Sequence, residues 1–258
     1  MFVLKLSYIE NFSEGYMKLL YLDEVDSTNL YGKKNLDVLE DKTVISACKQ
    51  TAGRGRLNRA WLDLGEGNLF VSIILKPSEV LDEKFSNLTQ YLSVVICKTL
   101  EKYGLKPEIK WPNDVLINGK KISGILCETV MQGHNLKGLV LGFGINITAN
   151  KSEVEKVTDK AVTSLALELN HKTPKSDDFL KCLLNYFFED YNKFLESGFN
   201  FIKHDYLSRV NFLGKELTVK GFSDTQTGIA KGVNDNGALM LENGDKKFVL
   251  TIGDILWA

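Results

Sequence analysis

The sequence is poor in the residues that build disulfide frameworks and metal sites. Its 258 residues include four cysteines, at positions far apart, and no C-x-x-C pair. Its three histidines stand in polar stretches without the spacing of metal ligands. This usage predicts reduced thiols, a cytoplasmic protein and no structural zinc site.

Long apolar runs and an excess of one charge are also missing. No apolar stretch reaches the roughly 18 residues that cross a bilayer, and Lys5 interrupts the apolar residues near the N-terminus, which argues against a signal peptide. A net charge of -1 argues against a general nucleic-acid binder. We therefore expect no membrane and no DNA partner. The sequence leaves open whether Met1 or Met17 is the true start.

Positive charge is concentrated in short loops, and one of them is especially rich in arginine. Residues 53–61 read Gly-Arg-Gly-Arg-Leu-Asn-Arg-Ala-Trp, with arginines at positions 54, 56 and 59. Glycines let backbone N–H groups approach an anion, and arginines add forked donors for carboxylate or phosphate. The stretch predicts a loop that closes over an anionic small molecule. Taken alone, it is also compatible with a solvated basic loop.

Apolar periodicity predicts alternating strands and helices before residue 210. We expect strands at 17–23, 43–48, 68–76 and 136–148, and helices at 85–103 and 177–195. Gly142 and Gly144 inside the last strand indicate either close approach of the backbone to a ligand or a bulge. Asp26 or Ser27 is expected to cap a helix, although hydroxyls there could also bind a polar ligand.

A second informative stretch covers residues 110–126. Asn118-Gly119 stands between two apolar runs and predicts a hairpin, because both residues tolerate positive φ. The hairpin would bring Asp114 and Lys121 onto one small patch of the surface, close to Asn113. These groups suit a metal–nucleotide complex or a carboxylate, and a plain surface ion pair is the alternative.

The character of the chain changes near residue 211. Short strands are expected at 216–220, 227–233, 238–242 and 247–251, separated by Asn-Gly turns and by Gly221. Closely spaced strands without helices between them predict a small β-barrel. We therefore expect an α+β protein with two domains, residues 1–209 and residues 210–258.

Taken together, the motifs resemble those of the biotin protein ligases. The motifs are Asp26-Ser27-Thr28-Asn29, Gln50-Thr51-Ala52-Gly53-Arg54-Gly55-Arg56 with Arg59 and Trp61, Lys110-Trp111-Pro112-Asn113-Asp114, Lys121-Ile122-Ser123-Gly124-Ile125-Leu126, and Gly142-Phe143-Gly144-Ile145-Asn146. The resemblance runs from about residue 18 to the C-terminus. One departure is Asn58, where the family loop has glycine. Asparagine tolerates a left-handed backbone better than other side chains, so we expect the loop geometry to survive.

The resemblance implies a fold and a two-step reaction. The larger domain would hold a mixed β-sheet with packed helices, and the smaller one would be an SH3-like β-barrel. Biotin would attack Mg-ATP to give biotinyl-5′-AMP, and a lysine of a biotin carboxyl carrier protein would then displace AMP. A lipoate or octanoate protein ligase is the alternative. Only about 17 residues precede the pattern, so we expect the form without an N-terminal helix-turn-helix repressor domain; a homodimer is left open.

The resemblance also implies roles for individual residues. Catalytic roles fall to Lys121, Arg54 and Asp114. Biotin contacts fall to Ser27, Thr28, Asn29, Gln50, Gly53, Arg54, Gly55, Arg56, Lys121 and Gly124. Contacts to ATP or the adenylate fall to Arg56, Arg59, Trp61, Asn113 and Asn146, and Asn113 and Asp114 are the candidate Mg²⁺ ligands. We expect the loop at 53–61 to become ordered when ligand binds.

Overall fold

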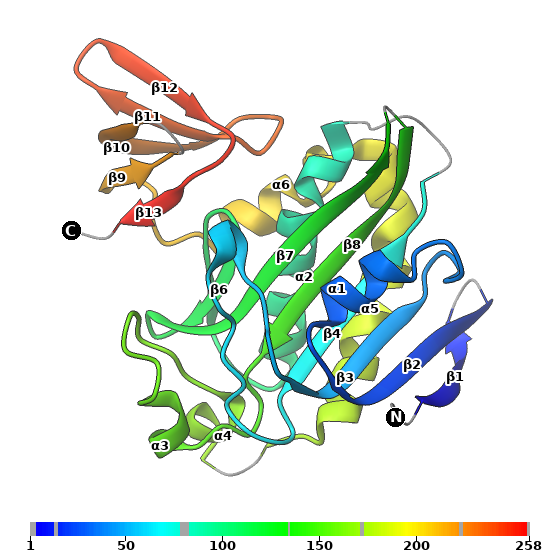
Figure 1. Cartoon of the computed structure of the whole chain (residues 1–258). Helices are drawn as coiled ribbons and strands as arrows, with labels where there is room; N and C mark the ends of the chain where they lie inside the picture. Colours follow the sequence, from blue (N-terminus) through cyan, green and yellow to red (C-terminus); the bar gives the residue numbers. More distant parts are fainter. Residues whose placement is uncertain are drawn as a thin grey trace.

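The larger part of the molecule is one mixed sheet of eight strands. The computed structural model describes residues 4–12, 15–77, 83–133, 135–170, 173–221 and 224–256. The sheet order is β1-β2-β3-β4-β8-β7-β6-β5 (Figure 1). The strands are β1 (Leu4–Phe12), β2 (Gly15–Val25), β3 (Val44–Gln50), β4 (Leu69–Leu75), β5 (Pro107–Lys110), β6 (Asp114–Ile117), β7 (Lys120–Gln132) and β8 (Asn135–Ile145).

The parallel pairing of β2 with β3 determines where the predicted motifs lie. Leu20 is opposite Ile45 and Val25 is opposite Gln50, so the two strands end at the same edge of the sheet. Helix α1 (Thr28–Lys34) makes the crossover between them, as a parallel pair requires. The residues after β2 and the loop after β3 therefore leave the sheet side by side.

Helices cover one face of this sheet and bury aromatic rings against it. These are α2 (Leu88–Lys102), α5 (Ser176–Ser197) and α6 (Phe199–Leu207), seen behind the strands in Figure 1. Tyr91 of α2 lies 5.1 Å from Phe187 and 4.5 Å from Phe194 of α5, measured between ring centroids. Both predicted helices are confirmed, except that 83–87 form a 3₁₀ turn, η2 (Glu83–Asn87), ahead of α2.

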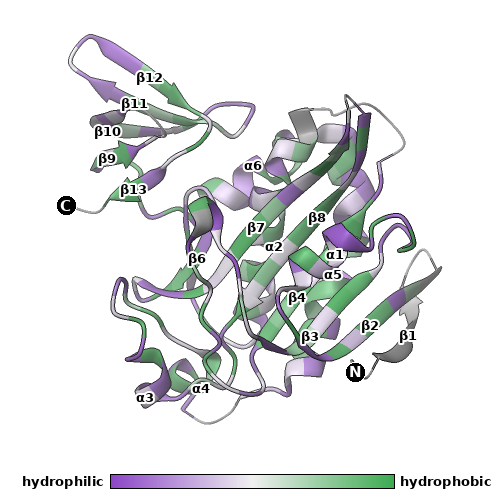
Figure 2. Cartoon of the chain, viewed as in Figure 1, coloured by the Kyte–Doolittle hydropathy of each residue, from purple (hydrophilic) through white to green (hydrophobic). Residues whose placement is uncertain are grey.

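Hydropathy follows this layering. Figure 2 shows hydrophobic residues along the central strands, whereas the tip between β11 and β12 is hydrophilic. Three short helical elements lie in the connections: η1 (Arg56–Asn58), α3 (Lys151–Val154) and α4 (Leu165–Glu168). No helix in the described ranges has the length and apolar character needed to cross a membrane.

The C-terminal part is a separate antiparallel sheet with the order β12-β11-β10-β9-β13. Its strands are β9 (Glu216–Lys220), β10 (Thr225–Val233), β11 (Leu239–Asn243), β12 (Lys246–Leu250) and β13 (Asp254–Leu256). The four predicted strands are confirmed, and β13, paired with β9, was not predicted. Closure into an SH3-like barrel stays a prediction, since no pairing of β12 with β13 joins the ends of the sheet among the described residues.

Strand β8 runs through its glycines without interruption, so a bulge there was the wrong alternative. Gly142 pairs with Ser72 on β4 in an unshifted register. The glycines instead make room for other side chains. A Cβ at Gly142 would overlap the amide of Asn29, and one at Gly144 would overlap the indole of Trp61. The close approach is therefore to protein side chains that themselves line the functional site.

Candidate functional site

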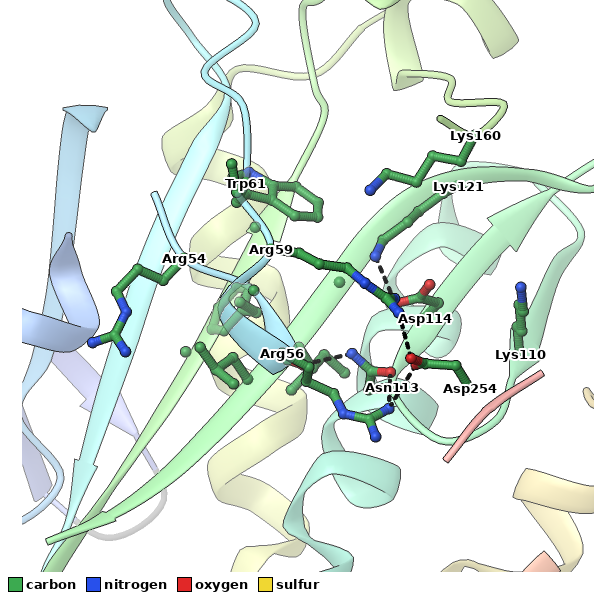
Figure 3. Close-up of a pocket in the computed structure, with 18 of the residues that line it drawn as sticks. Arg54, Arg56, Arg59, Trp61, Lys110, Asn113, Asp114, Lys121, Lys160 and Asp254 are labelled. Atoms are coloured by element: carbon green, nitrogen blue, oxygen red, sulfur yellow. Dashed lines mark hydrogen bonds and ion pairs between the residues drawn. The ribbon is translucent and has the colours of Figure 1, made fainter. Parts of the chain in front are cut away.

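Most of the predicted site residues line one cavity. This cavity has a volume of about 310 Å³ and lies at the edge where β2 and β3 end (Figure 3). The predicted residues in its wall are Ser27, Thr28, Asn29, Gln50, Arg54, Gly55, Arg56, Arg59, Trp61, Asn113, Asp114, Lys121 and Gly124. Gly53 and Asn146 are the two predicted residues outside this wall.

One end of the cavity is built from a buried hydrogen-bonded cluster. The Ser72 hydroxyl donates to Asn29 Oδ1 at 2.6 Å and lies 2.8 Å from Thr28 Oγ1. Gln50 Oε1 accepts from the Thr28 backbone N–H at 2.7 Å and from its hydroxyl at 3.2 Å. Since each group is fixed by a neighbour, these polar atoms keep their positions without a ligand.

Ser27 belongs to the same end but is less engaged. It is the N-cap of α1, yet its side chain makes no capping hydrogen bond. Its backbone N–H is bonded to Asp26 Oδ1 at 2.7 Å. The side chain is buried and lines the cavity, so the hydroxyl does not cap α1 and lies in the cavity wall.

Glu128 anchors this cluster from β7 and was not predicted from the sequence. Its Oε2 accepts from Asn29 Nδ2 at 3.0 Å, its Oε1 accepts from Lys33 Nζ at 2.9 Å, and Arg54 lies 3.8 Å away. Burial raises the pKa of Glu128, but the hydrogen bonds from Lys33 and Asn29 outweigh it, so the pKa lies below its ordinary value. The carboxylate is therefore charged at neutral pH.

The loop at residues 53–61, called the Gly/Arg loop from here on, is closed by its own backbone. Trp61 N–H donates to Gly53 O at 2.9 Å, and Gly55 N–H donates to Arg59 O at 2.8 Å. A Cβ at Gly53 would overlap the Trp61 carbonyl, so this glycine serves loop closure. The left-handed residue of the loop is Leu57, with φ of 53°. Asn58 is not among the residues with positive φ, and the expectation that the loop geometry survives the asparagine stays a prediction.

The loop's arginines point in two directions. Figure 3 shows Arg54 lying apart from Arg56 and Arg59, on the side of α1. Arg56 donates to Asn113 Oδ1 at 3.0 Å, and Arg59 pairs with Asp254 Oδ2 at 2.5 Å. Asp254 also lies 3.5 Å from Arg56. Burial lowers the pKa of Arg56, but a guanidinium remains charged at any physiological pH.

Asp254 connects the C-terminal sheet to the cavity. It is the first residue of β13, and the neighbouring Gly253 carbonyl accepts from Arg56 at 3.2 Å. No local pattern in the sequence predicts this contact, because Asp254 lies 195 positions after Arg59. The cavity wall is thus completed by the small C-terminal sheet.

Lys121 and Asp114 meet as predicted. Asn118 and Gly119 have φ of 52° and 74°, which confirms the hairpin between β6 and β7. Lys121 Nζ lies 2.6 Å from Asp114 Oδ1 and 5.3 Å from the centre of the Trp61 ring. The side chain of Lys121 is only 13% exposed, so the expectation that it faces the surface was wrong. The ammonium group of Lys121 therefore contributes its positive charge to the cavity wall.

A second cavity of about 290 Å³ adjoins the first. Trp61 and Lys121 line both, and the remaining wall is largely apolar, with Leu62, Leu64, Val157 and Val162. Asn146 lies in this wall, where its Nδ2 donates to the Thr163 carbonyl at 2.9 Å. The site therefore has a polar compartment and an apolar compartment that meet at Trp61 and Lys121.

The larger cavity carries a surplus of positive charge. Its wall contains six cationic side chains, from Arg54, Arg56, Arg59, Lys110, Lys121 and Lys160, and three carboxylates, from Asp114, Asp159 and Asp254. Lys110 and Lys160 were not assigned a role from the sequence. Burial lowers the pKa of Lys110, although nearby Asp114 opposes that shift. The wall is suited to a substrate with several negative charges.

The geometry offers no metal cage made of protein groups alone. Within the described ranges, no cluster of three or more His, Cys, Asp or Glu side chains could hold a metal ion. Asn113 Oδ1 accepts from Arg56, and Asp114 pairs with Lys121. Mg²⁺ commonly keeps several waters and needs only one or two carboxylates beside substrate phosphates. Asp114 would fit that requirement.

Comparisons with known proteins agree with this geometry. Residues 20–146 match the model of the biotin/lipoate A/B protein ligase family. The Bacillus subtilis bifunctional ligase/repressor BirA is 32% identical over 79% of this chain, and the chain spans 62% of the length of that relative. The biotin–[acetyl-CoA-carboxylase] ligase of Paracoccus denitrificans is 29% identical, with 92% of this chain and 99% of that protein covered.

A solved structure extends the likeness to three dimensions. The biotin protein ligase of Aquifex aeolicus in complex with biotin and ATP superimposes with a TM-score of 0.77 at 29% identity. The match covers 92% of this chain and 97% of that chain, so it includes the C-terminal sheet. The motifs, the two-compartment cavity and these likenesses lead to one conclusion: the chain belongs to the biotin protein ligases of the biotin/lipoate A/B protein ligase family.

Proposed function

We infer that this protein is an ATP-dependent biotin protein ligase. It activates biotin as biotinyl-5′-AMP and transfers the biotinyl group to a lysine of a biotin carboxyl carrier protein. One observation carries this inference: a polar compartment and an apolar compartment meet at Lys121 in a wall with surplus positive charge. Such a wall brings a carboxylate and a triphosphate together despite their mutual repulsion.

The buried polar cluster is the proposed site for the biotin ring. The ureido group of biotin has a carbonyl acceptor and two N–H donors, and the cluster offers both kinds of partner. The Ser27 hydroxyl and the Thr28–Gln50 pair line the cavity at this end. Asn29 uses both donors of its amide on Glu128 and Leu126, so we assign it to holding this end together as well as lining it. Arg54, Gly55 and Gly124 would enclose the ligand from the loop and from β7, and Gly53 would support them by closing the loop.

Adenylate formation is proposed to occur beside Lys121. A biotin carboxylate oxygen forms a bond to the α-phosphorus, and the bond from that phosphorus to the bridging oxygen of pyrophosphate breaks. The Lys121 ammonium and the Arg56 guanidinium would stabilise the negative charge that develops on the α-phosphate oxygens. Both groups need to keep their protons, and neither acts as a nucleophile.

The apolar compartment is the proposed adenine site. Trp61 offers a ring face for stacking, and Asn146 and Arg59 line the same compartment. Mg²⁺ would neutralise part of the triphosphate charge when bound, and Asp114 and Asn113, which both line the cavity, are the residues that we propose would hold it. In the second step the carrier lysine must lose a proton, and Asp114 is the carboxylate we propose to accept it.

Several coarser features are part of the same proposal. We propose that residues 210–258 form an SH3-like barrel domain, that residues 1–209 form the catalytic domain, and that the protein works in the cytoplasm without a DNA partner. Pairing of β12 with β13, measured by backbone NMR contacts, would test the barrel. A sequence-specific gel shift by this chain would contradict the expectation about DNA.

The direct test is a biotinylation reaction. The protein is incubated with ATP, Mg²⁺, biotin and a carrier domain, and the carrier lysine is examined by mass spectrometry. We expect an added biotinyl group that depends on both ATP and biotin. A folded enzyme that releases no pyrophosphate and modifies no lysine would contradict the proposal.

A lipoate or octanoate ligase is the rival within the same family. The same reaction is run with lipoate or octanoate and the matching carrier domain. Activation of these acids in preference to biotin would support the rival. The buried hydrogen-bonding cluster favours biotin, because neither the dithiolane ring of lipoate nor the alkyl chain of octanoate has a ureido group to satisfy it.

A further inference from the structure

Lys160 lies beside Lys121 because the backbone holds it there. The Lys121 N–H donates to Ala161 O at 2.9 Å, and Thr163 N–H donates to Lys121 O at 2.9 Å. These bonds make a parallel bridge between Lys121 and Val162. The segment that follows Lys160 is thus paired with the very residue at the junction of the two compartments.

The side chain of Lys160 faces both compartments. It lines the polar cavity and the apolar cavity, as Lys121 does. Figure 3 shows the two ammonium groups pointing into the same space beside Trp61. No sequence motif singled out Lys160, and the catalytic scheme above leaves it without a task.

The charge on Lys160 is weakly balanced compared with its neighbours. Its recorded ion pair is with Asp159 at 3.3 Å, and the Asp159 side chain is 67% exposed. Exposed pairs of this kind contribute little, because water screens them. Lys121 is instead held by Asp114 at 2.6 Å, and Arg59 by Asp254 at 2.5 Å. Among Lys121, Arg59 and Lys160, the charge of Lys160 is therefore the most available to a ligand.

We propose that Lys160 binds the β- and γ-phosphates of ATP and so holds the departing pyrophosphate. This rests on the proposed ligase function. In phosphoryl and nucleotidyl transfer the attacking and leaving oxygens lie roughly in line through phosphorus. Biotin approaches from the polar compartment and Lys121 stands at the α-phosphate, so the leaving group needs a different cation. Besides Lys121, the cations that line both compartments are Arg59 and Lys160, and Lys160 is the less tightly paired of these two.

The step is an electrostatic one and leaves Lys160 protonated throughout. As the carboxylate oxygen bonds to the α-phosphorus, the electron pair of the breaking bond goes to the bridging oxygen of pyrophosphate. That oxygen gains negative charge, which the ammonium stabilises. Biotinyl-5′-AMP has no β- or γ-phosphate. Lys160 should therefore matter for its formation and not for its use.

The two half-reactions can be measured separately in the full-length enzyme. The first is biotin-dependent pyrophosphate release at varied ATP, and the second is transfer from synthetic biotinyl-5′-AMP to a carrier domain. The variants are Lys160→Met, which removes the charge at similar length, and Lys160→Arg, which restores it. Lys156→Met is the matched control, because Lys156 lies on the same segment but is exposed and lines neither cavity.

For Lys160→Met we expect kcat/KM for ATP to fall about 10- to 100-fold, as for loss of one charge-assisted contact. Transfer from biotinyl-5′-AMP should stay close to wild type, Lys160→Arg should recover most of the loss, and Lys156→Met should match wild type. An unchanged ATP dependence in Lys160→Met, or equal losses in both half-reactions, would overturn the assignment. Absence of both half-reactions in the wild-type enzyme would instead overturn the proposed function.

Discussion

The two ends of the polar cavity are built on different principles. At the inner end, hydroxyl, amide and carboxylate groups from α1, β3, β4 and β7 hold one another in place through short hydrogen bonds. At the outer end, cations from the Gly/Arg loop and the hairpin are paired with carboxylates and a backbone carbonyl. One of these carboxylates, Asp254, comes from the C-terminal sheet. The first end is fixed by the fold, whereas the second is assembled from separate segments.

The difference indicates how each end should respond to change. A buried, hydrogen-bonded cluster recognises shape and hydrogen-bond pattern, and loss of one member leaves its partners unsatisfied. Cations paired with nearby carboxylates can exchange those partners for phosphate oxygens. We therefore expect substitutions at the inner end to affect stability and biotin affinity, and substitutions at the outer end to affect reaction rate.

The largest expected effect is at Lys121. Lys121→Ala should lower the rate of adenylate formation by about 10²- to 10³-fold, because it removes a charge from the point where negative charge develops. Pyrophosphate release measures this. Lys120→Ala is the matched control, since Lys120 is the adjacent, exposed residue of β7. A Lys121→Ala enzyme that forms adenylate at the normal rate would contradict the expectation that the cations of the outer end control the reaction rate.

Next in size is the effect of filling the space beside β8. Gly142→Ala places a methyl group against the amide of the buried Asn29 and should destabilise the protein by about 1–3 kcal/mol. Gly144→Ala meets the ring of the partly exposed Trp61, which can shift, so it should cost less stability. Thermal unfolding compares the two variants. A larger loss of stability for Gly144→Ala would mean that the surroundings of Trp61, and not those of Asn29, are the more rigid part of the cavity.

The pH dependence of stability should also distinguish the inner end. The pKa of Glu128 is lowered from 4.5, so its carboxylate stabilises the fold above about that pH, and the contribution is lost as the pH falls through the lowered pKa. Glu128→Gln should therefore be less stable than wild type at pH 7, and the difference should shrink below about pH 4.5.

Chemical denaturation at several pH values measures this difference. Glu24→Gln is the control, because Glu24 pairs with Lys49 at 2.6 Å on the surface, where both side chains are more than half exposed. A gap between wild type and Glu128→Gln that stays constant down to pH 3 would show that the charge of Glu128 does not support the inner end.

The smallest expected effect is at Arg59. Its side chain is 54% exposed, so the ion pair with Asp254 should contribute less than about 1 kcal/mol to stability. Arg59→Ala should leave the unfolding temperature nearly unchanged while weakening ATP binding, measured as KM for ATP. A large loss of stability would mean that the outer end is as rigidly built as the inner one.

Local patterns in the sequence were enough to predict most of the strands, the two longest helices and the motif residues of the cavity, whereas β1, β5 and β13 were not predicted. Asn118-Gly119 predicted the hairpin because both residues tolerate positive φ, and the hairpin places Asp114 beside Lys121. The expected ordering of the loop at 53–61 on ligand binding stays a prediction. Hydrogen exchange of the loop amides, with and without biotin and ATP, would measure it.

What the sequence could not predict depends on contacts between distant segments. Asp254 reaches the Gly/Arg loop across 195 residues, and Glu128 reaches α1 across 99 residues to Asn29. Both are single carboxylates in ordinary strands, without a local pattern to mark them. Lys160 acquires its position from backbone pairing with Lys121, which no periodicity encodes. Burial of Lys121 was missed for the same reason, since it comes from the segments packed around it.

The glycine at position 142 has a consequence for how sequences of this fold can vary. Its missing side chain and the amide of Asn29 occupy the same volume, so neither position can change freely on its own. We expect substitutions at these two positions to appear together among related proteins, with a larger residue on β8 accompanied by a smaller one at the start of α1. The same reciprocal constraint should link position 144 to position 61. During evolution the site would then change in matched pairs of residues, which are contributed by strands and loops far apart in the chain.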